Sequence, residues 1–211
     1  MKVCEIFASI QGESSYAGVP CTFIRMSGCN LRCSYCDTVY AYEEGTELTE
    51  GEIMGKVHAI GLKTVEITGG EPLLQRGVLA LTKRLLEHGF RVLMETNGSQ
   101  DIRHVDRRAV LIPDVKTPGS GMANTFLMSN LGLLRPVDEL KFVITGREDY
   151  EWSRNFAKEH SLTGKCILLF SPAFGILDAR DLSKWMIDDR LEARLNLQLH
   201  KYIYGPDVRG V

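Results

Sequence analysis

Three cysteines that stand close together are the residues with the clearest chemical potential in this sequence. Cys29, Cys33 and Cys36 are spaced as C-x3-C-x2-C. Cysteine thiolates are the usual protein ligands of iron–sulfur clusters, so three of them can hold three corners of a [4Fe–4S] cube. The fourth iron then has no ligand from this loop and is free to bind a small molecule. The spacing therefore predicts a cluster with an open corner, which permits catalysis.

Other interpretations of these cysteines remain open from the spacing alone. A structural zinc site needs four ligands, and the nearest downstream histidine is His58. The thiols can also be incidental. A disulfide framework is disfavoured because the chain opens MKVCEIF, without the leader of a secreted protein, and cytosolic thiols stay reduced. We therefore expect a cytoplasmic protein. Cys4, Cys21 and Cys166 stand among apolar residues and are expected to be small buried hydrophobes.

The length and composition fit one soluble globular domain over residues 1–211. The formal net charge is −2, so electrostatics gives no argument for nucleic acid or an acidic membrane surface as a partner. No apolar run approaches the length that crosses a bilayer. We expect neither nucleic acid nor a membrane to be a partner.

Short apolar runs alternate with helical patterns along the chain. The runs predicted as strands are Val3–Ala8, Cys21–Met26, Thr64–Thr68, Arg91–Thr96, Ala109–Asp114, Glu139–Ile144, Cys166–Phe170 and Leu195–His200. Helices are predicted after Thr49 and over Val78–His88, Asp149–His160 and Asp181–Met186. This order predicts right-handed βαβ crossovers and a mostly parallel sheet.

The chain is too short for a complete eight-unit barrel, which takes about 250 residues. Between Pro113 and Leu134 the helical pattern fails, so we expect loops or very short helices there. The predicted fold class is therefore α/β, an open partial (β/α) barrel with a mostly parallel sheet and reduced helical connections. Sites in such sheets gather at the carboxyl ends of the strands.

Polar motifs follow several of the predicted strands. The segment Gly69-Gly70-Glu71-Pro72 comes directly after one of them. Its glycines allow a ligand to approach the backbone, and Glu71 is an acceptor for an ammonium group. Other polar groups at strand ends are Glu95–Ser99, Asp114 with Lys116, Ser171-Pro172 and Asn196–Lys201. A tight turn explains Gly-Gly-Glu-Pro taken alone, but together these motifs indicate one active site.

The motifs resemble those of the radical S-adenosylmethionine (SAM) superfamily, through the cysteine loop and Gly69–Pro72. Within it the chain is similar to the 7-carboxy-7-deazaguanine synthase family of queuosine and deazapurine biosynthesis. The closer resemblance rests on Ser9–Ser14, Phe23–Arg25, Cys36–Thr38, Thr68–Pro72, Glu95–Ser99 and Gln198–Lys201. It covers nearly the whole chain.

The resemblance implies a defined reaction. The open iron of a [4Fe–4S] cluster chelates SAM, and reductive cleavage of SAM gives a 5′-deoxyadenosyl radical. The radical takes a hydrogen from 6-carboxy-5,6,7,8-tetrahydropterin, whose ring contracts with loss of ammonia to 7-carboxy-7-deazaguanine. SAM is regenerated, and Mg²⁺ assists at the substrate. The resemblance also implies a flavodoxin- or ferredoxin-like electron donor and a homodimer.

Roles for individual residues follow from the same resemblance. Cofactor-binding roles fall to Gly69, Gly70 and Glu71 at the amino group of SAM, and to Asn97, Ser99 and Ser171 at its ribose or carboxylate. Substrate-binding roles fall to Gln11, Gly12, Glu13, Arg25, Thr68, His200 and Lys201. The cluster is assigned to Cys29, Cys33 and Cys36, and Mg²⁺ to Thr38. Asp114, Lys116 and the tail Tyr202–Val211 receive no firm role.

Two alternative functions share parts of this pattern. A glycyl-radical activating enzyme has the same cysteine loop, but its protein substrate does not need a pterin-reading pocket such as Gln11-Gly12-Glu13 would form. A non-catalytic zinc or electron-transfer module is disfavoured by Gly69–Pro72 at a strand end. The resemblance therefore favours a pterin-converting lyase.

Overall fold

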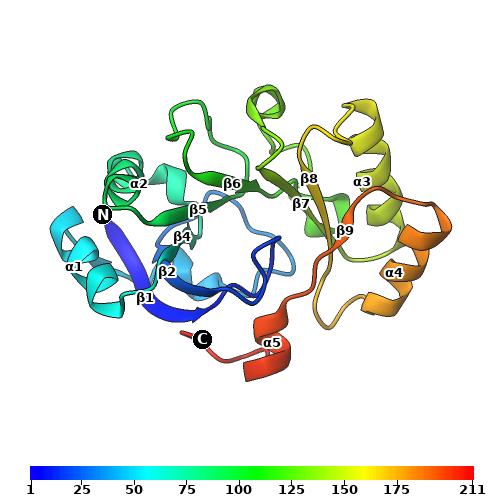
Figure 1. The fold of residues 1–211 in the computed structure, drawn as a ribbon. Coiled ribbons are helices and arrows are strands. Elements are labelled where there is room, and N and C mark those ends of the chain that lie inside the picture. The colour runs from blue at the N-terminus through cyan, green and yellow to red at the C-terminus, as the bar shows by residue number, and fades with distance from the viewer.

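The computed structural model describes residues 1–211 and has an α/β architecture in the form of an open, partial barrel (Figure 1). Its strands are β1 (Lys2–Ile10), β2 (Pro20–Met26), β3 (Thr46–Glu47), β4 (Thr64–Gly69), β5 (Arg91–Thr96), β6 (Val110–Pro113), β7 (Glu139–Ile144), β8 (Ile167–Pro172) and β9 (Arg194–Leu195). Its α-helices are α1 (Glu50–Ile60), α2 (Val78–Glu87), α3 (Arg147–Glu159), α4 (Ala179–Asp188) and α5 (Leu199–Tyr204). Short 3₁₀ helices are η1 (Val39–Tyr42), η2 (Pro72–Leu74), η3 (Pro118–Ser120) and η4 (Met128–Leu133).

The strands form two sheets, ordered β3-β1-β2-β4-β5-β6 and β7-β8-β9. β1 pairs antiparallel with both β2 and β3, whereas β2, β4, β5 and β6 pair in parallel, as do β7, β8 and β9. A bridge between Asp114 and Lys141 joins the sheets, and the Val115 N–H donates to the Lys141 carbonyl at 2.8 Å. The strands therefore curve as one array that does not close. This confirms the predicted partial barrel.

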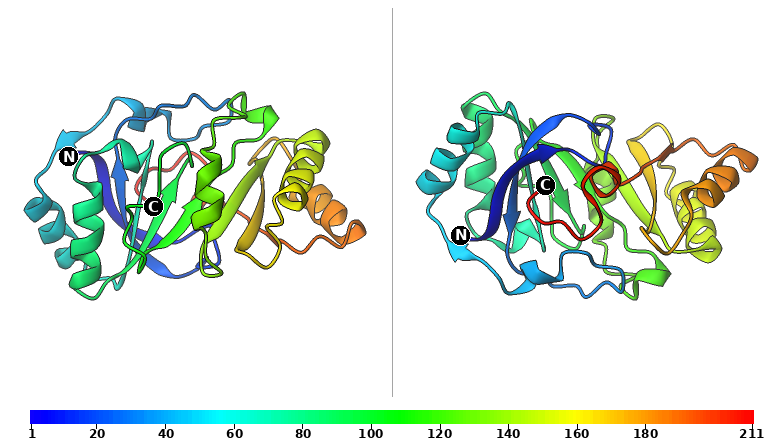
Figure 2. Two further views of the ribbon diagram at one scale, coloured as in Figure 1. Left: turned by 90° about the horizontal axis from the view of Figure 1, so that it is seen from above. Right: turned by 90° about the horizontal axis from the view of Figure 1, so that it is seen from below.

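The helices pack on the outside of the curved array, with α1 and α2 on one flank and α3 and α4 on the other (Figures 1 and 2). No helix connects β5 to β6, and only η3 and η4 lie between β6 and β7. The reduced connections predicted between Pro113 and Leu134 are therefore confirmed. α5 and the C-terminal segment lie across the open side of the barrel (Figure 2).

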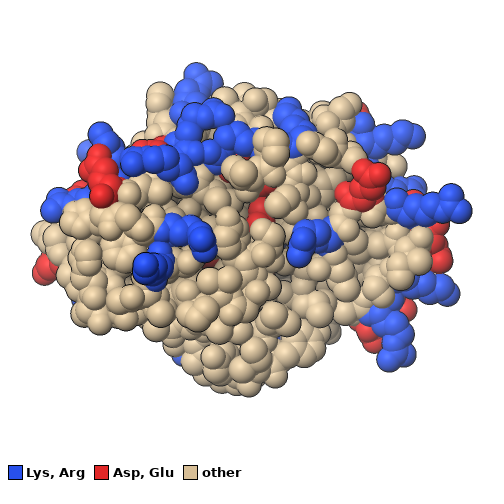
Figure 3. Space-filling model, in the orientation of Figure 1, with Lys and Arg blue, Asp and Glu red and all other residues tan.

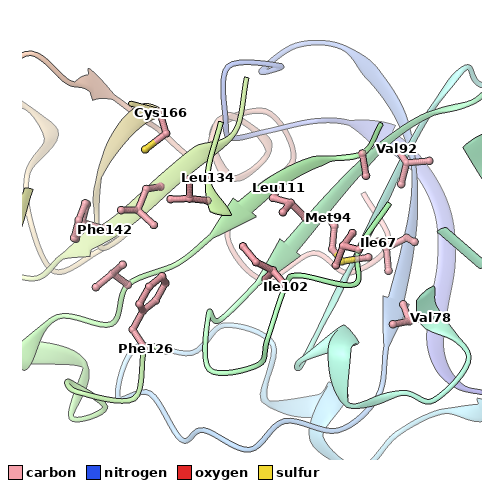
Figure 4. Close-up of a cluster of buried hydrophobic side chains, with 14 of the residues drawn as sticks. Ile67, Val78, Val92, Met94, Ile102, Leu111, Phe126, Leu134, Phe142 and Cys166 are labelled. Carbon is pink, nitrogen blue, oxygen red and sulfur yellow. The ribbon is translucent and has the colours of Figure 1, made fainter. Parts of the chain in front are cut away.

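The period-two alternation of the strands separates the core from the interior of the barrel. In β4, Val65 and Ile67 join the main hydrophobic core, shown in part in Figure 4, and Glu66 between them lines an internal cavity. In β7, Leu140 packs in the same core, and Lys141 lines the cavity. Alternate residues of these strands therefore build the core and the site.

The α1 helix illustrates how local sequence fixes the element boundaries. Thr49 and Glu52 form a reciprocal capping box at its start, which satisfies two free backbone N–H groups. Gly61 follows its last turn at φ +77°, a left-handed conformation that glycine adopts without steric cost. The prediction of a helix after Thr49 is confirmed.

The predicted last strand, Leu195–His200, is wrong. β9 ends at Leu195, and α5 begins at Leu199. The backbone changes partners between them, because the Asn196 N–H still donates to Phe170 of β8 while the Leu199 N–H donates to Gly12 of the β1–β2 loop at 2.7 Å. A short alternation of polar and apolar residues does not distinguish a strand from a turn that leads into a helix.

None of the helices has the length and apolar character that a membrane crossing requires. Lys and Arg side chains lie over the upper, left and right-hand parts of the face in Figure 3, and the lower part, over α5, shows almost none. The exposed residues of α5 are Tyr202, Ile203 and Tyr204.

Candidate active site

A cavity of about 560 Å³ lies inside the open barrel, at the carboxyl ends of β4, β5, β6 and β8. The β1–β2 loop, the cysteine loop, α5 and the C-terminal residues 206–211 complete its wall. The position agrees with the expectation that sites gather at the carboxyl ends of parallel strands.

The three cysteines of the loop are free thiols that line this cavity, and each is partly buried. The Leu31 N–H and the Asn97 side-chain amide point at Cys29 Sγ, at 3.4 Å and 3.8 Å. Burial raises the pKa of Cys33. Three unpaired thiols beside a cavity, with N–H groups directed at one sulfur, fit the donor set of an iron–sulfur cluster.

The spacing of the donors bears on the choice between an iron–sulfur cube and a single zinc ion. Zinc needs ligands that converge on one point at about 2.0–2.3 Å, and no three His, Cys, Asp or Glu side chains converge in this way. In a cube each thiolate binds its own iron, so the sulfurs stand apart. The residues present therefore include no preformed zinc site, and the three thiols of the loop are the donor set available to a cluster.

Gly69 and Gly70 let the end of β4 pass directly against the start of the cysteine loop. The Gly69 backbone has φ +139°, and a Cβ atom on Gly70 would lie 2.1 Å from the carbonyl oxygen of Gly28. The Glu71 N–H donates to the same oxygen at 2.8 Å. The two glycines therefore fix the cysteine loop against the strand end, which is a structural reason for their presence.

Replacing Gly70 by alanine is expected to lower the free energy of unfolding by about 1–3 kcal/mol, because the methyl group meets rigid backbone, and to reduce the iron bound per chain. Gly55→Ala is the matched control, since Gly55 lies inside α1 with nothing within 4 Å of the added methyl group. That change should stabilise by about 0.5–1 kcal/mol. Urea unfolding and iron analysis measure both effects, and equal behaviour of the two variants would contradict this account.

The Glu71 side chain is placed differently from the prediction. It is fully buried and does not line the cavity. Its carboxylate accepts hydrogen bonds from the Leu73 N–H at 3.0 Å, the Thr96 hydroxyl at 2.9 Å and the Asn97 N–H at 2.7 Å. The carboxylate therefore ties the end of β5 to η2, since its oxygens are already occupied by donors of the protein itself.

A buried lysine organises the charges on the cavity wall. Lys141 Nζ lies 3.0 Å from Glu13 Oε2 and 3.1 Å from Glu95 Oε1. Glu95 also accepts from the Thr68 hydroxyl at 3.0 Å, and Glu13 from the Gln198 amide at 2.9 Å. Burial would raise the pKa of Glu13, but Lys141 and Gln198 outweigh it and lower that pKa. Glu13 is therefore ionised.

Glu66 and Gln11 form a second polar group beside this network. Gln11 Nε2 donates to Glu66, and Gln11 Oε1 accepts from the Glu13 N–H at 2.5 Å. Burial and the neighbouring Glu95 raise the pKa of Glu66 well above its ordinary value. Gln11 is thus held at both ends of its amide.

The α5 helix brings two further predicted residues into the site. Gly12 is in close contact with His200, because a Cβ atom there would lie 2.1 Å from His200 Nδ1. Lys201 Nζ pairs with Asp37 Oδ2 at 2.5 Å, next to the cysteine loop. Burial would raise the pKa of Asp37, but Lys201 and a hydrogen bond from Thr38 lower it to about 2. Burial lowers the pKa of His200.

Arg25 of β2 is a further cation that lines the cavity. Its Nε donates to Glu5 at 2.6 Å, and the Tyr40 hydroxyl donates to the same carboxylate at 2.9 Å. The terminal nitrogens of Arg25 make no hydrogen bond within the protein, so they are available to a ligand. Arg209 of the C-terminal segment lies over the Tyr40 ring at 3.7 Å and closes this side.

Most of the residues selected from the sequence meet at this cavity. Those that line it are Gln11, Gly12, Glu13, Arg25, Cys29, Cys33, Cys36, Thr38, Thr68, Gly69, Gly70, Asn97, Ser171, His200 and Lys201. Glu71 and Ser99 do not. The Ser99 hydroxyl instead accepts from the Asn30 amide at 2.9 Å.

Sequence reasoning missed two charged residues of the wall. Glu66 and Lys141 alternate with apolar residues inside strands that are otherwise buried, and this alternation is the signal that could have identified them. Glu95 belongs to the predicted polar segment Glu95–Ser99 but received no role of its own. Asp114 and Lys116, whose roles were left open, form an ion pair at 2.7 Å and both line the cavity.

The fold and the cysteine loop together define the class of this protein. Residues 23–111 match the sequence profile of the Radical SAM superfamily. The crystal structure of QueE from Escherichia coli superposes with a TM-score of 0.79 and 25% identity, over 94% of each chain. The chain is thus a radical SAM protein, a class whose members use a [4Fe–4S] cluster and SAM.

Full-length relatives identify the family within this class. The 7-carboxy-7-deazaguanine synthase of Koribacter versatilis is 44% identical over 100% of both chains. The 7-carboxy-7-deazaguanine synthase of Chlorobaculum tepidum is 47% identical over 100% of this chain and 97% of its own. The chain belongs to the 7-carboxy-7-deazaguanine synthase family, as the sequence motifs predicted.

Proposed function

We propose that the chain is a radical SAM lyase that converts 6-carboxy-5,6,7,8-tetrahydropterin to 7-carboxy-7-deazaguanine with loss of ammonia, in queuosine precursor biosynthesis. The observation that carries the proposal is the 44–47% identity over the full chain to synthases of that name. The ionised Glu13 and the free guanidinium edge of Arg25 in the same cavity support it. When bound, the cluster supplies the electron that cleaves SAM.

The cofactor is assigned to the cysteine side of the cavity. Cys29, Cys33 and Cys36 would hold the cluster, with SAM at its open iron. The Gly69-Gly70 backbone would face the amino group of SAM, because the Glu71 carboxylate is occupied by other donors. Asn97 and Ser171, which line the cavity, would bind the ribose or carboxylate.

The substrate is assigned to the side formed by β1, β2 and α5. The terminal nitrogens of Arg25 suit the pterin carboxylate, since a guanidinium pairs with a carboxylate through two parallel hydrogen bonds. Glu13 and Gln11 would read the aminopyrimidine edge. Thr68, His200 and Lys201 would complete the contacts, with Gly12 providing room for His200.

Thr38 is the proposed ligand of Mg²⁺. Its hydroxyl lies beside Asp37, to which it donates at 2.8 Å, and a hydroxyl oxygen is an acceptable ligand for a small cation that keeps most of its waters. We further propose that residues 1–211 act as one domain, that the protein is a cytoplasmic homodimer, and that a flavodoxin- or ferredoxin-like protein is the electron donor.

Product analysis of anaerobically reconstituted protein tests the proposal. With SAM, a one-electron reductant, Mg²⁺ and the carboxytetrahydropterin, mass spectrometry should detect 7-carboxy-7-deazaguanine, and omission of any organic component or of the reductant should abolish it. Cleavage of SAM only after addition of a partner polypeptide would contradict the proposal and favour a glycyl-radical activating enzyme.

A further inference from the structure

Glu66 is a buried carboxyl group in the cavity for which the motifs provide no role. It lies in the middle of β4, and its exposed fraction is 1%. It still lines the cavity, and its single hydrogen bond comes from the Gln11 amide, which Oε2 accepts. The other oxygen, Oε1, makes no hydrogen bond within the protein.

The charges around Glu66 leave it without a cation. The titratable groups that face it are Glu13 from the β1–β2 loop, Cys21 from β2, Glu95 from β5 and Lys141 from β7. Lys141 is the only positive group among them, and it already pairs with Glu13 and Glu95 at 3.0 Å and 3.1 Å. A buried carboxyl group that lacks a cation as partner and lies near another carboxylate is more stable in its protonated form.

We propose that Glu66 is a neutral carboxylic acid that donates its O–H to the ring carbonyl of the bound heterocycle, and thereby selects a 2-amino-4-oxo ring over a 2,4-diamino ring. This inference rests on the proposed function, because it takes a pterin as the ligand. A protonated carboxyl group has one O–H donor. Since Oε2 accepts from Gln11, the donor belongs to Oε1.

Glu13 and Glu66 then read opposite features of one ring. Glu13 is ionised and can only accept, so it suits N–H groups of the aminopyrimidine edge. Glu66 donates, so it suits the carbonyl oxygen. A 4-amino ring would place an N–H group against the O–H of Glu66, and a buried donor without an acceptor costs about 1–3 kcal/mol.

Substitution of both acids by glutamine separates these roles. Glutamine mimics a neutral acid because it keeps a carbonyl acceptor and has an NH₂ donor group in place of the O–H, in nearly the same shape. Glu66→Gln should therefore retain ligand binding within a few fold. Glu13→Gln, the matched comparison, should lose binding and stability, since it removes an ionised partner of Lys141. Glu66→Leu removes the donor and should lose the preference between the two rings.

Calorimetry on the cluster-loaded protein with SAM measures the preference. The probes are pterin-6-carboxylate and 2,4-diaminopteridine-6-carboxylate, which differ in the 4-substituent and in the N3 proton that the 4-oxo ring carries. The comparison with Glu66→Leu therefore identifies the part of the preference that depends on Glu66. The wild type and Glu66→Gln should bind the oxo compound about tenfold or more tightly than the diamino compound, by the cost of the unpaired donor. Equal binding of both compounds by the wild type would overturn the donor role. Binding of neither compound would overturn the proposed function.

Unfolding at different pH values tests the neutral state independently of any ligand. Because the pKa of Glu66 is higher in the folded protein than in the unfolded chain, its contribution to stability is complete at low pH and is lost as pH rises. Glu66→Gln abolishes this loss. The stability of Glu66→Gln relative to wild type should therefore increase from about pH 5 to about pH 8. A relative stability that does not change with pH, or that falls, would overturn the neutral state.

Discussion

Replacing Cys29, Cys33 or Cys36 by alanine is expected to abolish both cluster binding and turnover. Each thiol is free and lines the cavity, and together they are the three cysteines of the loop. Removing one thiol leaves only two protein ligands for the cluster. External thiols are then expected to extract the cluster from the protein. The reconstituted variants should lose the brown absorption of the cluster and most of their iron and labile sulfide.

Cys166→Ala is the matched control for these variants. Cys166 is also a free cysteine, but it is buried in the main hydrophobic core. Its replacement should leave the iron content unchanged and affect only stability, by about 1 kcal/mol. Full iron loading in any variant of the three loop cysteines would contradict the assigned ligand set.

Lys141→Met is expected to cause the largest loss of stability of any single change in the cavity wall. Lys141 is 8% exposed and compensates two carboxylates, Glu13 and Glu95. Removing one partner of a buried ion pair costs about 3–5 kcal/mol, because the remaining charge is buried without compensation. Activity should fall as well, since the orientation of Glu13 depends on this lysine.

The pH dependence of the Lys141→Met effect follows from the pKa of Glu13, which Lys141 lowers. A group with a lowered pKa stabilises the fold above its unfolded pKa, and this stabilisation is lost as pH falls. The stability difference between wild type and variant should therefore be largest near neutral pH and shrink in acid. Urea unfolding at several pH values measures it.

Lys158→Met is the control, because Lys158 is an exposed residue of α3 without an ion pair. Its effect should stay within about 0.5 kcal/mol. If Lys141→Met cost no more than this control, or the same amount at every pH, the buried network would not have the charges assigned to it.

The sequence predicted those parts of the site that depend on local spacing. The cysteine loop and the Gly69-Gly70 pair each consist of residues that lie close together in the sequence. Each pattern can therefore be recognised within one short segment. Lys141 was missed because its role depends on its ion pair with Glu13, which lies 128 residues away in the chain. No local pattern reports a contact of that separation.

The errors have a similar physical origin. The Glu71 carboxylate was expected to face a ligand. Its oxygens instead accept hydrogen bonds from the Asn97 N–H and the Thr96 hydroxyl at the end of the neighbouring strand. Polar and apolar residues alternate over Leu195–His200 as they do in a strand. The Gly12 carbonyl nevertheless accepts a hydrogen bond from the Leu199 N–H, and α5 begins there. In both places tertiary hydrogen bonds override the local pattern.

The most direct test of the central claim is to follow one hydrogen atom. The claim is that the cluster, SAM and the carboxytetrahydropterin meet in this single cavity. A substrate deuterated at the carbon that carries the carboxylate is mixed with reduced, cluster-loaded protein and SAM. We predict that deuterium appears at the 5′ carbon of recovered SAM together with 7-carboxy-7-deazaguanine. Deuterium retained in unreacted substrate, with SAM cleaved and unlabelled, would contradict the account.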